Sequence, residues 1–231
     1  MDLTSCPASP VRWERDLKSD GAIVLHYSMC RPAFPDSGKQ RRMERYFARL
    51  AQLWQARWEN ELFLYARQAF AARQPDKPFS PWQACMEYQI TYWNPPLLSI
   101  RIDIKEQGAA APPALQCIGE VWDCTGGYPC SLYSFLPQKP FRWKKCLISL
   151  LQEQAGQRLD SGEALLYDNC LSAIKDSFDP ERFYLTEDGV TVFYPLYTLG
   201  PYGEGIPTFS IPVSQSNQSN RFRAPSMTAR R

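Results

Sequence analysis

Few residues in this chain are of the types that carry out covalent chemistry. His26 is the only histidine among 231 residues, which excludes most histidine-based triads and metal sites. Asp103, Glu120 and Asp123 lie on or beside predicted strands, and they would serve a hydrolase only if they converged in one cleft. The sequence contains neither a phosphate-binding glycine loop nor a Gly-x-Ser-x-Gly motif. We therefore expect no catalytic residue, no metal site, no cofactor and no enzymatic activity.

The eight cysteines are an even number, which invites a disulfide interpretation. None belongs to a Cys-x-x-Cys pair, so the sequence does not indicate a zinc site. A chain of this length can fold without covalent cross-links, and we expect most of these thiols to be small core residues. If any pair is oxidised, we expect it to be Cys124 and Cys130, which flank Gly126 and Gly127.

The residues best suited to binding a ligand lie near the C-terminus, within 181–212. Segments 183–186 and 190–194 are rich in aromatic and β-branched residues, which are typical of strands. Asp188-Gly189 lies between them and predicts a tight turn, because glycine adopts positive φ at low cost. The two segments are therefore predicted to form a β-hairpin.

A loop rich in glycine and proline separates this hairpin from a last predicted strand, 208–211. Loops on a rigid sheet often carry recognition residues, and tyrosine is a frequent anchor at interfaces. The candidate ligand-binding residues are therefore Tyr197, Pro201, Tyr202 and Gly205. The alternative is that the two tyrosines only pack against the end of the sheet.

The helices and strands that position this loop are predicted from the spacing of apolar residues. A long helix is predicted over 39–73, because apolar residues recur there at spacings of three or four. The recurring residues are Met43, Phe47, Leu50, Trp54, Trp58, Leu62, Tyr65 and Ala69. Further strands are predicted at 21–29, 85–93, 97–104 and 115–124, and shorter helices at 140–156 and 161–178. Because strands and helices do not alternate regularly, we predict an α+β fold: an antiparallel β-sheet covered by one long and two shorter α-helices.

Length and composition indicate one soluble globular domain. Apolar residues make up 44% of the chain and charged residues 22%, which is ordinary for such a domain. We predict an irregular N-terminal segment at 1–20, a single domain at 21–213 and a disordered polar tail at 214–231. The first segment lacks the apolar run of a signal peptide, and no run of 18 apolar residues occurs. We therefore expect no membrane span and a cytoplasmic location.

The charge of the chain is small overall but uneven. The net charge of +2 does not favour a nucleic-acid partner, and we expect none. Segment 39–49 is basic, whereas segment 160–188 is acidic. Such segments are typical of solvated faces. The basic face of the long helix is also a candidate contact for a protein partner, with Arg42 and Arg45 at its centre.

The C-terminal run resembles the RsiV-type domain of unknown function. That family has an aromatic-x-Leu-Thr-x-Asp-Gly turn, a short aromatic strand, a Tyr-x-x-x-Pro-Tyr-x-x-Gly loop and a strand ending near Ile-Pro. The matching residues here are Phe183, Leu185, Thr186, Asp188, Gly189, Phe193, Tyr194, Tyr197, Pro201, Tyr202, Gly205, Phe209, Ile211 and Pro212. Segment 122–126 also resembles the family's aromatic-Asp-x-Thr-Gly element, and the resemblance covers residues 20–212.

The resemblance implies a non-catalytic binding or sensor-type domain. The RsiV-type domain is the lysozyme-receptor part of a bacterial anti-sigma factor, and a related domain is the N-terminal domain of the peptidoglycan deacetylase PdaC. A lysozyme-like protein or a peptidoglycan fragment is therefore the implied ligand, bound by the sheet and the 197–205 loop. Association with the cell envelope is implied too. Two alternatives stay open: a cytoplasmic structural or regulatory protein-interaction module, and a carboxylate-dependent hydrolase.

Overall fold

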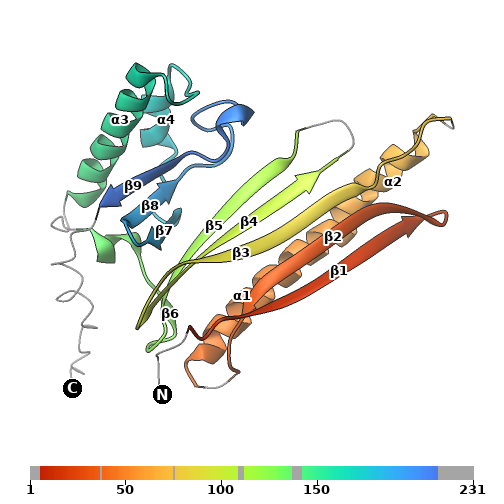
Figure 1. The fold of residues 1–231 in the computed structure, drawn as a ribbon, viewed down its shortest axis with the longest axis horizontal. Helices are drawn as coiled ribbons and strands as arrows, with labels where there is room; N and C mark the ends of the chain where they lie inside the picture. Colours follow the sequence, from red (N-terminus) through yellow and green to blue (C-terminus); the bar gives the residue numbers. More distant parts are fainter. Residues whose placement is uncertain (1–5, 37, 75, 109–111, 137–141, 213–231) are drawn as a thin grey trace.

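The computed structural model describes residues 6–36, 38–74, 76–108, 112–136 and 142–212, which form two sheets and several helices (Figure 1). The strands of the larger sheet are β1 Ser9–Ser19, β2 Ala22–Ala33, β3 Trp82–Asn94, β4 Leu97–Gln107, β5 Ala114–Asp123 and β6 Tyr128–Pro129. The strands of the smaller sheet are β7 Phe183–Thr186, β8 Gly189–Phe193 and β9 Thr208–Pro212. The α-helices are α1 Gln40–Arg57, α2 Phe63–Ala71, α3 Trp143–Ser161 and α4 Cys170–Asp176.

The larger sheet is mixed, so the prediction of a purely antiparallel sheet is wrong. Its strands lie side by side in sequence order, and β2 pairs with β3 in parallel, from Leu25 opposite Trp82 to Met29 opposite Met86. The other neighbouring pairs are antiparallel. The connection explains the exception, because α1 and α2 carry the chain back along the sheet between β2 and β3 (Figure 1). Long helical crossovers of this kind join parallel strands.

The predicted irregular segment 1–20 contains β1, which pairs with β2 along its whole length. Asp20 and Gly21 connect the two strands, and both have positive φ, of 50° and 80°. A two-residue hairpin turn of this type requires positive φ at both positions. β1 is an edge strand with mostly exposed side chains, several of them charged, such as Arg12 and Glu14. Charged side chains are common on edge strands because they hinder aggregation. Because β1 carries them, its sequence does not show the apolar alternation by which a strand is predicted.

The long predicted helix is present but is interrupted by a π-helical turn at Trp58–Leu62. Before this turn, Met43 and Phe47 are buried as predicted. After it, the buried residues are Ala66 and Phe70, whereas the predicted Tyr65 is 55% exposed. A π-helical turn is wider than an α-helical turn. It therefore shifts the face that packs on the sheet by one residue.

The described residues form two hydrophobic cores. The first lies between α1, α2 and one face of the larger sheet, and it contains the fully buried Trp58 and the side chains of Ile100, Ile102 and Ile104. The second lies among α3, α4 and the smaller sheet, and β4 and β5 contribute Leu97 and Val121 to it. Alternate residues of a strand point to opposite faces, so β4 and β5 belong to both cores.

α3 runs beside the free edge of β9 (Figure 1). Gln154 donates from Nε2 to the carbonyl oxygen of Ser210 at 2.9 Å, and Arg158 donates from a guanidinium nitrogen to that of Thr208 at 2.9 Å. These bonds satisfy edge carbonyls that another strand would otherwise pair. The predicted tail 214–231 lies outside the described residues. Among the described helices, none combines the length and apolar character that crossing a membrane demands.

Candidate functional site

The predicted binding loop follows β8 and presents two tyrosines on one surface. The rings of Tyr197 and Tyr202 lie with their centroids 6.2 Å apart at an angle of 40°. Tyr197 has a φ of 64° and is 52% exposed. Pro201 precedes a short 3-10 turn that begins at Tyr202, and Gly205 ends this turn with a φ of 73°. The structure therefore brings the four predicted residues into one loop, in which Pro201 and Gly205 shape the backbone.

This loop is fixed to the segment between α3 and α4 by short polar contacts. The backbone N–H of Tyr167 donates to the carbonyl oxygen of Leu199 at 2.8 Å. The N–H of Leu165 donates to the Glu204 carboxylate at 2.7 Å. The loops also approach closely at Gly200, where a Cβ would lie 2.4 Å from the carbonyl oxygen of Leu165. These contacts hold the tyrosines in place before any ligand binds, which lowers the entropic cost of binding.

The two connected loops carry Leu165, Tyr167, Tyr197 and Tyr202. Leu165 is 61% exposed and Tyr167 is 39% exposed, and hydrogen bonds from their N–H groups join them to the loop that carries Tyr197 and Tyr202. We call these four residues the two-loop patch. Exposed apolar groups of this kind often mark interaction sites. Leu165 and Tyr167 were not predicted as site residues, because they precede the tyrosine loop by about thirty positions and no local pattern links them to it.

The three candidate hydrolase carboxylates do not converge. Glu120 lies on the face of β5 that packs on α1, where it accepts a hydrogen bond from the Tyr46 hydroxyl. Asp103 is on the opposite face of the sheet and pairs with Arg101 at 2.9 Å. Asp123 accepts hydrogen bonds of 2.7 and 3.1 Å from the backbone N–H groups of Thr125 and Gly126, and so caps a turn. Three groups in separate surroundings do not form an acid–base pair.

The cysteines are unpaired, and the histidine lies next to a carboxylate. All eight thiols are free, including those of Cys124 and Cys130. Burial raises the pKa of the Cys124 thiol to about 12 and that of Cys130 to about 11. Such thiols are poor nucleophiles. The His26 ring lies 2.8 Å from the Asp16 carboxylate, on the neighbouring strand. Among the described residues, no group of three or more metal-ligating side chains comes together.

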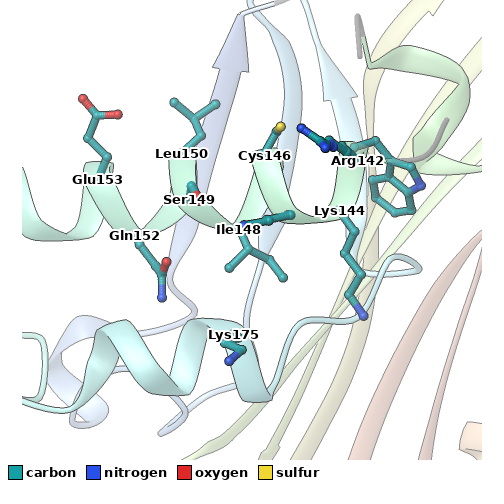
Figure 2. Close-up of a pocket in the computed structure, with 11 residues that line it drawn as sticks. Arg142, Lys144, Cys146, Ile148, Ser149, Leu150, Gln152, Glu153 and Lys175 are labelled. Carbon is teal, nitrogen blue, oxygen red and sulfur yellow. The ribbon is translucent and has the colours of Figure 1, made fainter. Parts of the chain in front are cut away.

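A concave feature surrounds the first turns of α3, and we call it the α3 groove. Its volume is about 1180 Å³. Figure 2 shows Lys144, Ile148 and Gln152 pointing from α3 toward α4, which carries Lys175. The full lining consists of Arg142, Trp143, Lys144, Lys145, Cys146, Ile148, Ser149, Leu150, Gln152, Glu153 and Lys175. The groove was not predicted, because Lys175 lies far along the chain from the other cations and only the packing of α4 on α3 brings them together.

The molecule is thus a mixed α+β domain in which a smaller sheet packs on a larger, curled one. Residues 142–214 match the model of the family described as "Protein of unknown function (DUF3298)". The matched segment contains α3, α4, the smaller sheet, the two-loop patch and the α3 groove. No curated protein matches this chain.

Two solved structures are similar to this one. A DUF3298 family protein from Pseudomonas aeruginosa PAO1 has 18% identity and a TM-score of 0.56, over 91% of this chain and 92% of that one. A DUF3298 family member from Bacteroides fragilis NCTC 9343 has 18% identity and a TM-score of 0.58, over 89% of this chain and 88% of that one. At this level of identity the likeness shows a shared fold.

Proposed function

We propose that this chain is a non-catalytic binding domain that recognises a protein or a cell-wall glycan through the two-loop patch. The observation that carries the proposal is the Tyr197–Tyr202 ring pair, in which Tyr197 is exposed and Tyr202 half-buried, on a loop anchored by hydrogen bonds. Tyrosine rings supply a large contact area at a low cost in side-chain entropy. They pack on apolar protein surfaces and on the faces of sugar rings, so the patch fits either ligand class.

The resemblance to the RsiV-type and PdaC-type domains supports a ligand at the bacterial cell envelope. The resembling residues of the C-terminal run lie in β7, β8, β9 and their connections, which include the loop that carries Tyr197 and Tyr202 of the patch. Glu163, Asp168 and Glu204 belong to the same two loops. Negative charge around an apolar centre favours encounter with a cationic partner, and a lysozyme-like protein is such a partner. A peptidoglycan fragment is the other candidate.

The test is titration calorimetry of the purified chain with lysozyme and, separately, with soluble peptidoglycan fragments. Saturable binding to one of them is expected, and Tyr202→Ala should weaken it by about tenfold or more, as truncation of an aromatic anchor does. Tyr65→Ala is the control, because Tyr65 is an exposed tyrosine that lies on α2. Absence of binding to both ligands, or an equal loss in both variants, would contradict the proposal.

A second candidate function, a protein-interaction module in the cytoplasm, is favoured by the outer face of α1. Lys39, Arg42, Arg45 and Arg49 are exposed there. Within the described part of the chain, none of these four forms an ion pair, whereas the nearby Arg41 pairs with Asp36 at 2.7 Å. Unpaired cations on one helix face are suited to an acidic protein surface.

Charge reversal tests this second function. Arg42→Glu combined with Arg45→Glu should abolish a complex that co-purifies with the wild-type chain, because two attractions become repulsions. Survival of that complex would refute the contact. The matched control is Arg12→Glu combined with Lys105→Glu, which changes the charge equally on strands away from α1.

A further inference from the structure

The α3 groove combines positive charge with apolar walls. Its cationic lining residues are Arg142, Lys144, Lys145 and Lys175, against the single carboxylate of Glu153. Among the described residues, none of these four cations forms an ion pair. The Lys144 ammonium lies 5.4 Å from the centroid of the Phe178 ring, so it packs on an aromatic face instead of on a carboxylate. The groove therefore presents positive charge that the described fold leaves uncompensated.

The apolar lining comes from Trp143, Ile148 and Leu150, which are half-buried. A simple inorganic anion would not make use of these walls. The volume of about 1180 Å³ also exceeds the roughly 300–1,000 Å³ that is usual for small-molecule pockets. Size, charge and apolar surface together fit a peptide that carries both acidic and apolar side chains.

Hydrogen bonds hold the walls of the groove in place before any peptide binds. Gln152 donates from Nε2 to the carbonyl oxygen of Leu171 at 2.7 Å, which ties α3 to α4. The bonds from Gln154 and Arg158 to β9 hold the other side of α3. Lys144, Ile148 and Gln152 follow one another at intervals of four, so they line one face of the helix (Figure 2). A peptide that binds here need not order the groove, which favours affinity.

We infer that the α3 groove binds an acidic peptide segment of a partner protein along the face of α3 that is turned toward α4, with its carboxylates on Lys144 and Lys175 and its apolar side chains against Ile148. The chain's own C-terminal residues do not fit as the occupant. Segment 213–231 has four arginines and neither Asp nor Glu, so it would meet the groove with like charge. The groove is separate from the two-loop patch, and the inference does not depend on the proposed function.

The probe for this inference is a fluorescein-labelled peptide that repeats Glu-Leu, titrated with the full chain and followed by fluorescence anisotropy. Saturable binding that weakens with added salt is expected. Lys144→Gln combined with Lys175→Gln should weaken it by about tenfold, since two charge contacts are lost. Lys77→Gln combined with Lys105→Gln removes the same charge outside the groove and should leave the affinity unchanged, as should Tyr202→Ala.

Two further probes separate a peptide groove from a general anion site. A Glu-Ser repeat keeps the charge and should bind more weakly, and Ile148→Ser should erase the difference between the two peptides. The inference is overturned if the Glu-Leu peptide does not saturate, if both lysine pairs weaken binding equally, or if the Glu-Ser peptide binds as tightly. It is also overturned if double-stranded DNA or inorganic polyphosphate binds more tightly than the peptide. Thermal unfolding checks that each variant is folded. If the variant with Lys144→Gln and Lys175→Gln is not folded, Lys144→Gln alone replaces it in the titration.

Discussion

The Ser99 hydroxyl, in β4, accepts a hydrogen bond of 2.8 Å from the backbone N–H of Leu185, in β7. Ser99 is fully buried, and its hydroxyl also lies 2.9 Å from that of Thr91. This contact is a polar link between the two sheets within otherwise apolar surroundings. Since a buried N–H without a partner is costly, the link helps to fix where the smaller sheet sits on the larger one.

Ser99→Ala should therefore lower the free energy of unfolding. The substitution leaves the Leu185 N–H buried without an acceptor, which costs about 1–3 kcal/mol. Urea denaturation measures the change. Ser134→Ala is the control, because Ser134 is exposed and, among the described residues, its hydroxyl meets only that of Ser131. Its effect should stay within about 0.5 kcal/mol. Equal stability of the Ser99 and Ser134 variants would show that the link is not a stabilising contact.

Gly119→Ala should also disturb the contact between the sheets. A Cβ at Gly119 would lie 2.0 Å from the carbonyl oxygen of Phe183, so the backbone of β7 would have to move. Overpacking of this kind typically costs about 1–3 kcal/mol. Gly156→Ala is the matched control, because nothing lies within 4 Å of a Cβ at that position in α3. The control should stabilise by about 0.5–1 kcal/mol, since alanine is the better helix former. Urea denaturation measures the free energy of unfolding of both variants. If both change it in the same direction, the prediction is contradicted.

Tyr197→Gly should separate stability from binding. Tyr197 has a φ of 64°, in a region where glycine is not strained and other residues are. The variant should therefore unfold at a temperature equal to or above that of the wild type. It should nevertheless bind the envelope ligand at least about tenfold more weakly, because the exposed ring is lost. Calorimetry of unfolding and of binding measures both effects. A large loss of stability would mean that the ring packs the end of the sheet, which is the alternative interpretation of the sequence.

Local signals in the sequence predict the C-terminal hairpin well. The hairpin forms as predicted, but its turn lies one residue earlier than the Asp-Gly motif indicates. Thr186 pairs with Gly189, so Glu187 and Asp188 are the two residues of the turn, and Gly189, with a φ of 137°, begins β8. The last strand, Thr208–Pro212, follows from its alternation. In each case the signal and the structure lie within a few residues of each other, so local turn chemistry locates the hairpin to within one residue.

Features set by contacts between distant segments could not be predicted in the same way. The parallel pairing of β2 with β3 depends on how the long helix packs, and the π-helical turn at Trp58–Leu62 moves Tyr65 out of the core and Ala66 into it. The candidate sites depend on distant segments too. Leu165 meets the tyrosine loop, and Lys175 joins Lys144 in the lining of the α3 groove, only after α3 and α4 have packed on each other and on the smaller sheet.

Two carboxylates of β5 should affect stability with opposite dependence on pH. Burial by itself would raise the pKa of the Asp123 carboxyl, but hydrogen bonds from Thr125 and Gly126 lower it overall. A lowered pKa in the folded state stabilises the protein above the unfolded value of about 3.9, and this stabilisation is lost as the pH falls through the folded value. Asp123→Asn should thus destabilise at neutral pH, and the difference from the wild type should shrink below about pH 4.

Glu120 should show the reverse behaviour. Burial beside Tyr46 raises the pKa of its carboxyl, and the nearby negative charge of Glu181 adds to the rise. The folded state then holds the proton more tightly than the unfolded state, whose value is about 4.3. The stability that this group contributes is present below that value and is lost as the pH rises through the folded pKa.

Glu120→Gln keeps an acceptor for the Tyr46 hydroxyl without the charge, so it should stabilise the protein at pH 7 and have little effect near pH 4. Urea denaturation of the two variants across this range measures both trends. If the Glu120 variant is no more stable than the wild type at pH 7, then the carboxylate is better solvated than its position against α1 implies.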